Sequence, residues 1–195
     1  MELNQNRKSL REVFGSVLAF LRASWKDYLV FFLAAGTLIA LDQWTKHLVR
    51  TNLPLGGDWL PESLNWLMPY ARIRHWYNSG AAFGLFQQGN LIFTVLAFIV
   101  SGVILYYFPS MPRKDWWLRL ALVLQFTGAV GNMIDRLRFQ HVTDFISVGD
   151  FAVFNVADAS ISVGVAILVL GVFLQEQAEK KKARIAAQPV PETKK

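Results

Sequence analysis

The sequence predicts an all-α membrane protein of four transmembrane helices with a small β element. This element is expected to be a short β-sheet on the non-cytoplasmic face. The 195 residues are 53% hydrophobic and 14% aromatic, and their mean hydropathy of +0.30 is too high for an ordinary soluble domain. Four apolar segments are each close to the twenty residues that cross the hydrocarbon of a bilayer. The longest region between them alternates apolar and polar side chains, which is typical of strands.

The first span is expected at residues 25–44, with a tryptophan at each end. Trp25 and Trp44 would lie about 28 Å apart along a helix, as anchors at two membrane interfaces do. Residues 1–24 are basic and carry apolar side chains at helical spacing, so we expect a basic interfacial segment there. Secretory signal peptides also place a basic region before an apolar run, but this run is longer than a signal core and lacks a convincing cleavage site.

The other spans are expected at residues 90–108, 116–134 and 155–174. Trp116 marks the start of the third span, where Arg119 can extend its guanidinium group to the interface. Residues 25–174 thus form the expected transmembrane domain, and residues 175–195 are expected to be a basic, disordered cytoplasmic tail. Small residues in the third and fourth spans permit close helix packing, namely Gly128, Gly131 and Gly164.

Residues 51–88 form the longest region outside the spans. Prolines and glycines divide it, and Ile73, His75 and Tyr77 alternate with other side chains in a pattern that favours short strands over a helix. We expect a small β-sheet lying on the outer leaflet. His75 is the only histidine in this region, and His47 and His141 are equally isolated, so the sequence predicts no metal site.

The basic residues indicate how the chain crosses the membrane. They concentrate before the first span, in the loop after the second span and in the tail, which four spans place on one side. The opposite side carries fewer basic residues over more chain, so both termini are predicted to be cytoplasmic. The net charge of +6 is explained by this topology. The basic residues do not lie along one folded face interleaved with aromatic residues, so no nucleic-acid partner is expected.

Polar residues from four separate parts of the chain then meet at the non-cytoplasmic face. These are Asp42, Lys46, Asn78, Asp135, Arg136 and Asp158. An ionised carboxylate near hydrocarbon costs several kcal/mol, so it indicates a functional site. Asp135, Asp144 and Asp158 all lie beside apolar segments, and two aspartates acting as acid and base are the most economical explanation. Asp135 stands next to Arg136 and also fits a salt bridge or a site-shaping role. The chain has no cysteine, which excludes thiol catalysis and disulfides.

The same residues also have simpler structural interpretations. Asp158, Asn132 and Asn155 can each cap a helix end. Asp42 and Lys46 are one helical turn apart and can form a local ion pair, which is compatible with a role in stabilising a site.

Five motifs follow one another between residues 42 and 158, namely DQWTK, NSGAAFG, GNMIDR, VTDF and FNVAD. Each lies at the outer end of an expected span or in an outer loop. In this order they resemble the motif set of the prolipoprotein signal peptidase family, also called signal peptidase II. The resemblance implies a four-helix intramembrane aspartyl protease of the bacterial cytoplasmic (inner) membrane. It also implies removal of the signal peptide from diacylglyceryl-modified prolipoproteins, with cleavage just before the lipidated cysteine.

The resemblance assigns Asp144 and Asp158 as the catalytic pair. Two carboxylates that share one proton can act as base and acid toward a water molecule without a covalent intermediate. Asp158 would lie in the first turn of its helix, where the dipole favours its anion, so Asp144 is expected to carry the shared proton. The other motif residues are implied to bind substrate or shape the site, namely Asn78, Gly80, Asn132, Arg136, Asn155, Asp135, Asp42 and Lys46.

The same resemblance implies that the protein is a monomer surrounded by membrane lipids and uses no cofactor or metal. It also implies that cyclic peptides inhibit the enzyme. One departure concerns the stretch between Asp144 and Asp158, which is shorter than the family suggests and contains an additional acid, Asp150. This difference bears on substrate preference or loop dynamics.

The alternative function is a small transporter or ion relay that uses the same carboxylates, which would place acids near mid-span or in repeats. A noncatalytic membrane scaffold would not require aligned polar residues.

Overall fold

The computed structural model describes residues 2–80 and 89–186, with side chains from Ser24 onward except at positions 184 and 186. Four helices in these ranges are long and apolar enough to cross a membrane: Ser24–Asn52, Asn90–Ser110, Trp116–Phe139 and Val156–Ala183. The predicted four-helix architecture is therefore confirmed. Three expectations fall outside the described residues, namely the apolar stripe within 1–23, positions 81–84 of the second motif and the tail after residue 186.

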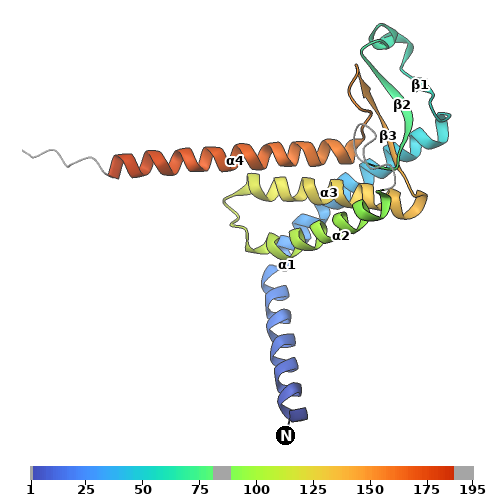
Figure 1. Ribbon diagram of the computed structural model, residues 1–195. Helices are drawn as coiled ribbons and strands as arrows, with labels where there is room; N and C mark the ends of the chain where they lie inside the picture. Colours follow the sequence, from blue (N-terminus) through green and yellow to red (C-terminus); the bar gives the residue numbers. More distant parts are fainter. Residues whose placement is uncertain (1, 81–88, 187–195) are drawn as a thin grey trace, which may run out of the picture.

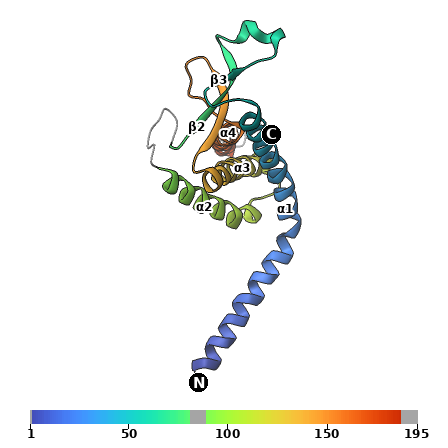
Figure 2. The same cartoon turned by 90° about the vertical axis from the view of Figure 1, so that its right-hand side faces the viewer.

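Helix α3 (Trp116–Phe139) lies at the centre of the bundle. It packs against α1 (Glu2–Asn52), α2 (Asn90–Tyr107) and α4 (Val156–Ala186), and Figures 1 and 2 show it between these helices. Phe31 of α1 forms the middle of the apolar core, with its ring centroid 4.5 Å from that of Phe108 and 4.9 Å from that of Phe126. Many other large apolar side chains of the helices are exposed, which suits surfaces that face lipid.

Glycines allow α3 and α4 to approach closely, as the sequence predicts. A side chain at Gly128 would overlap the carbonyl group of Ala157, and one at Gly164 would come within 2.9 Å of the carbonyl oxygen of Ala121. Small residues at such contacts let helix backbones come together in a membrane. This contact brings the outer half of α3 against the first turn of α4, where the candidate site lies.

Helices α1 and α3 continue beyond their predicted ends. The first extends past Trp44 to Asn52, and the third extends past residue 134 to Phe139. The sequence prediction ended both spans where charged residues begin. Asp42 and Lys46 are completely buried and paired with each other inside the protein. Because these charges need no contact with water, the helix does not have to end there.

Both terminal segments are helical in the residues that the structure describes, and for the tail this differs from the prediction. The interfacial segment expected at residues 1–24 is continuous with α1, and Figure 2 shows it extending away from the other helices. The tail expected to be disordered from residue 175 remains helical as far as Ala186. Alanine, glutamine, glutamate and lysine dominate this part of α4 and have high helix propensity. An ion pair of 2.6 Å between Glu176 and Lys180, one turn later, also stabilises this part of the helix.

A three-stranded antiparallel sheet lies at one end of the bundle, at the opposite end from the connection between α2 and α3 (Figure 1). Its strands are β1 (Asp58–Trp59), β2 (Ala71–Asn78) and β3 (Val142–Val148), in the order β1-β2-β3, and a short 3-10 helix η1 (Glu62–Leu67) connects the first two. The predicted sheet within residues 51–88 is confirmed for β1 and β2. The sequence analysis did not predict β3, which adds residues from between the third and fourth spans and carries Asp144.

Candidate active site

The structure brings polar residues of five elements together at the sheet end of the bundle. The sheet ends of α1 and α3, the first turn of α4, and strands β2 and β3 each contribute side chains. The convergence that the sequence analysis expected is therefore present. The residues form two connected groups, one around Asp144 and Asp158 and one around Asp42 and Asp135.

Asp158 occupies the first turn of α4 and is held by hydrogen bonds to both of its carboxylate oxygens. Asn132 on α3 donates its side-chain amide to Oδ1 at 2.7 Å, and the backbone N–H of Asn155 donates to Oδ2 at 3.2 Å. The side-chain oxygen of Asn155 in turn accepts a hydrogen bond from the backbone N–H of Asp158 at 3.0 Å. This reciprocal pattern is a capping box, so Asp158 does cap the helix while its carboxylate stays at the site.

Asp144 lies on β3 and is almost completely buried. The side-chain amide of Asn155 donates to its Oδ1 at 2.6 Å, and that of Asn78 on β2 donates to its Oδ2 at 3.0 Å. Burial, followed by the charge of Asp158, raises the pKa of Asp144 to about 7. A carboxyl group of this kind can hold a proton at neutral pH and still release it in a reaction.

Asn155 connects the two carboxylates directly. Its side-chain amide contacts Asp144 and also donates to Oδ1 of Asn132 at 3.1 Å, while its backbone contacts Asp158. The short connection between β3 and α4 fixes this arrangement, because Ile146 and Phe154 exchange backbone hydrogen bonds of 2.7 and 3.0 Å across it. The shortness noted in the sequence therefore keeps Asp144 close to the start of α4.

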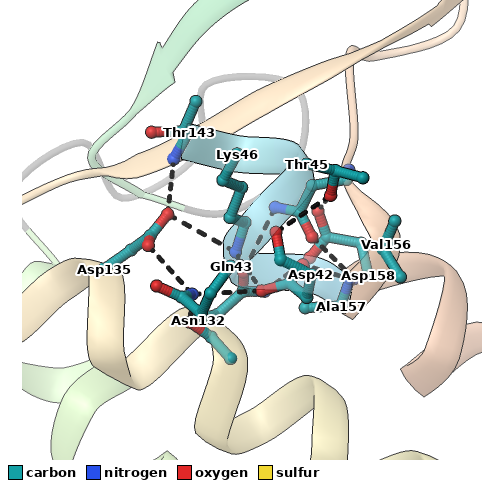
Figure 3. Close-up of polar contacts among 12 residues, drawn as sticks. Asp42, Gln43, Thr45, Lys46, Asn132, Asp135, Thr143, Val156, Ala157 and Asp158 are labelled. Carbon is teal, nitrogen blue, oxygen red and sulfur yellow. Dashed lines mark hydrogen bonds and ion pairs between the residues drawn. The ribbon is translucent and has the colours of Figure 1, made fainter. Parts of the chain in front are cut away.

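The second group is a buried network of ion pairs between α1 and α3 (Figure 3). Nζ of Lys46 lies 2.9 Å from Oδ2 of Asp42 and 3.4 Å from Oδ2 of Asp135. Arg50, one further turn along α1, lies 3.6 Å from Oδ1 of Asp135. The expected pair of Asp42 and Lys46 is present. Asp135 does form salt bridges, but with two residues of α1 instead of the adjacent Arg136.

Backbone groups complete this network and attach it to the neighbouring elements. The N–H of Thr143 on β3 donates to Asp135 at 3.0 Å, and the N–H of Ala157 on α4 donates to Asp42 at 2.9 Å. Lys46 also donates to Oδ1 of Asn132 at 2.9 Å, which connects the network to the residue that holds Asp158. The ion pairs thus fix β3 and α4, the two elements that carry Asp144 and Asp158.

Arg136 points toward the same region from the end of α3. Its Nη2 donates to the carbonyl oxygen of Gly80 at 3.4 Å, and the N–H of Gly80 is itself bonded to the side chain of Asn78 at 3.0 Å. The buried Nε of Arg136 has no hydrogen-bond partner within the described residues. The side chain therefore retains a donor for another molecule.

A groove of about 310 Å³ leads to Asp158 between α2, α3 and α4. Asn132, Arg136 and Asp158 form its polar end, and aliphatic and aromatic side chains such as Phe93, Leu96 and Val100 form most of the rest. An extended or helical apolar segment with one polar end would fit the chemistry of this lining.

The histidines do not form a metal site in the described part of the chain, and no group of three or more histidine or acidic side chains suited to a metal occurs there. His75 is buried in β2, and its Nδ1 lies 2.8 Å from the carbonyl oxygen of Leu53. His141 packs against the ring of Tyr77, with centroids 3.7 Å apart.

The sequence analysis missed three residues of the site. These are Gln43, Arg50 and Thr143. The side-chain amide of Gln43 donates to both Asp42 and Asp135 at 3.2 Å. Arg50 pairs with Asp135 as described, and Nη1 of Arg50 also donates to Oγ1 of Thr143 at 2.9 Å. The spacing of Asp42, Lys46 and Arg50, four residues each, places them on one helix face and could have indicated Arg50. Gln43 and Thr143 lie within the motifs DQWTK and VTDF, which could have indicated them.

The chain is similar to proteins of a known family. Residues 34–174 match the family model described as signal peptidase (SPase) II. A lipoprotein signal peptidase of Shouchella clausii is 40% identical over 154 residues, covering 78% of this chain and 99% of the relative. One of Mesorhizobium japonicum is 39% identical over 166 residues, covering 83% and 94%. A bacterial membrane enzyme solved at 2.3 Å by the in meso method superposes with a TM-score of 0.69 at 28% identity, covering 83% of this chain and 94% of that one.

Proposed function

The chain belongs to the signal peptidase II family and is a multi-pass membrane protease, and from this premise we propose that it cleaves signal peptides from diacylglyceryl-modified prolipoproteins with Asp144 and Asp158 as its catalytic pair. The observation that carries the proposal is the hydrogen bonding of Asn155 to both carboxyl groups, one of which has a pKa raised to about 7. In this proposal the pair acts as an acid and a base, and Asp158 lies at the polar end of an apolar groove.

The proposed reaction uses one proton shared by the pair. Asp158, at a helix N-terminus and with two hydrogen-bond donors, takes the ionised form and removes a proton from water. Asp144 takes the protonated form and donates to the oxygen of the scissile carbonyl group as the water attacks its carbon. When the tetrahedral intermediate breaks down, Asp158 protonates the leaving amine and Asp144 recovers its proton. The peptide bond is hydrolysed without a covalent intermediate.

The groove between α2, α3 and α4 suggests how the substrate is placed. Its apolar lining suits the signal helix, which would run beside α3 and α4, and the lipid attached to the cysteine. The bond before that cysteine would lie at the polar end near Asp158. Arg136 lines this polar end, where its guanidinium group would donate to a substrate carbonyl group, and Gly80 lets backbone approach closely.

The ion pairs of Asp42, Lys46, Asp135 and Arg50 have a supporting role in this proposal. They carry two negative and two positive charges, so the network is neutral overall. Their backbone contacts with Thr143 and Ala157 position the strand and the helix of the catalytic pair. Asp135 is therefore a positioning residue in our proposal.

The proposal includes the setting in which the reaction takes place. We place the protein in the bacterial inner membrane as a monomer, with both termini in the cytoplasm and the active site near the non-cytoplasmic face, on the basis of its charge distribution. No cofactor or metal takes part, and cyclic peptides that occupy the groove would inhibit cleavage. The ion-relay alternative has less support, because Asp135 lies near the end of α3, Asp158 in the first turn of α4 and Asp144 on β3, instead of near mid-span.

The test is cleavage of a diacylglyceryl-modified prolipoprotein by purified protein in lipid or detergent. Asp144→Asn and Asp158→Asn should each abolish turnover at equal folded yield. Asp150→Asn is the matched control, since it makes the same change at an exposed acid only six residues from Asp144 and should leave turnover unchanged. Full turnover by either dyad variant would refute the assigned pair, and a wild-type protein that never cleaves this substrate would refute the proposed function.

A further inference from the structure

A basic hollow lies at the end of the bundle opposite the candidate active site. It has a volume of about 300 Å³ and is lined by Lys26, Asp27, Val30, Arg113 and Arg119. These residues come from the first turns of the α1 span and of α3 and from the connection before α3. We infer that this basic hollow binds the phosphate group of an anionic glycerophospholipid, in the leaflet opposite the active site. The inference goes beyond the proposed function, because the two sites share no residue.

The charges in the hollow leave room for an anion. Asp27 accepts hydrogen bonds from Nε and Nη2 of Arg113, both at 3.1 Å, and from Nη2 of Arg119 at 2.6 Å. One carboxylate thus faces three cations. Lys26 has no hydrogen-bond partner among the described residues, and its ammonium group contacts only the ring of Trp25, at 5.7 Å from the centroid. A phosphodiester would compensate one of the two excess positive charges.

The two arginines are already oriented for such a ligand. Nη1 of Arg119 donates to the carbonyl oxygen of Met111 at 2.9 Å, and its guanidinium carbon lies 4.3 Å from the centroid of the Phe108 ring. Asp27 then fixes Arg113 relative to Arg119. Since the protein itself holds these groups, a phosphate that binds them does not have to order them.

The position of the hollow favours a lipid over a soluble anion. Trp25 and Trp116 are 55% and 67% exposed beside it, as tryptophans at the headgroup level of a membrane are. Val30, one turn deeper on α1 and 64% exposed, offers an apolar wall to the first carbons of an acyl chain. Basic pockets at helix ends on one membrane side are a known type of site for anionic headgroups. A glycerophospholipid uses both the cations and the apolar wall.

The test is native mass spectrometry of the full protein in detergent, titrated with phosphatidylglycerol or with phosphatidylcholine of the same acyl chains. The wild type should bind phosphatidylglycerol at least fivefold more tightly. Each removed cation should weaken that binding about fivefold, so Lys26→Gln should lose about fivefold and the Lys26→Gln/Arg113→Gln double variant about 25-fold. Lys26→Gln leaves the three-residue network around Asp27 in place, which keeps the test valid if the double variant folds poorly.

The matched control is Lys181→Gln/Lys182→Gln, which removes the same charge from exposed positions of α4 beyond the same end of the bundle. It should change the affinity by less than twofold. Phosphatidylglycerol should also raise the melting temperature of the wild type but not that of the double variant. An equal loss in the control, equal binding of the two lipids, or displacement of phosphatidylglycerol by millimolar inorganic phosphate would each overturn the inference.

Discussion

Replacing Asp144 with asparagine should make the protein more stable at neutral and alkaline pH, although it removes activity. The pKa of this buried carboxyl group is about 7, against an ordinary value of 3.8. Between these two pH values the unfolded chain releases the proton while the native state retains it. The native state therefore loses about 1.4 kcal/mol of stability for each pH unit in that interval. The asparagine variant has no such group, so its stability relative to wild type should rise by about 4 kcal/mol between pH 4 and pH 7 and remain constant above that.

The measurement is the free energy of unfolding between pH 4 and pH 9, obtained by reversible unfolding in mixed micelles and followed by tryptophan fluorescence. Wild type, Asp144→Asn and Asp150→Asn are compared at each pH. Asp150 is exposed, so its variant should follow the wild type throughout. A stability difference between Asp144→Asn and wild type that does not change with pH would refute the reasoning. A variant that is less stable than wild type at pH 8 would refute it as well.

Three further predictions concern turnover and packing. Turnover should fall as the pH rises above about 7, because Asp144 then loses the proton that the proposed mechanism donates; a pH profile of single-turnover cleavage measures this. Asn155→Ala should reduce turnover by about 100-fold, since it removes the side-chain amide that donates to Asp144 and the side-chain oxygen that accepts the backbone N–H of Asp158. Asn65→Ala at an exposed position should leave turnover unchanged, and matched cleavage assays decide. Gly131→Ala should destabilise the protein by about 1–3 kcal/mol, because the new methyl group would lie 2.7 Å from the buried Asp42 carboxylate. The control is Gly36→Ala, whose methyl group would enter open space, and thermal unfolding of the two variants measures the difference.

The helix bundle could be predicted from the sequence for clear physical reasons. Long apolar runs specify spans whatever their packing, and successive spans place helix ends at alternate ends of the bundle. Once the spans were placed, the polar residues at their ends were expected to meet at one end of the bundle. The prediction that Asp42 pairs with Lys46 required only helical geometry, and the structure has this pair at 2.9 Å.

The details that could not be predicted depend on contacts between distant segments. The prediction ended two helices at charged residues because hydropathy cannot tell that Lys46 and Asp135 neutralise each other across 89 positions of the chain. Strand β3 was missed because most of its residues are buried on both faces, so its sequence lacks the alternation of a half-buried strand. The partners of Asp135 were likewise unpredictable, since Arg50 approaches it from another helix.

The two groups of the site show why asparagines surround the proposed catalytic pair. Asp42 and Asp135 form ion pairs with lysine and arginine side chains. The salt bridges of the described residues do not include Asp144 or Asp158, whose contacts are mainly asparagine amides. An amide fixes the position of a carboxyl oxygen without supplying a full positive charge, so burial and the neighbouring carboxylate can still raise the pKa of Asp144. The ion pairs are connected to Asp158 by two hydrogen bonds through Asn132, which accepts from Lys46 and donates to Asp158.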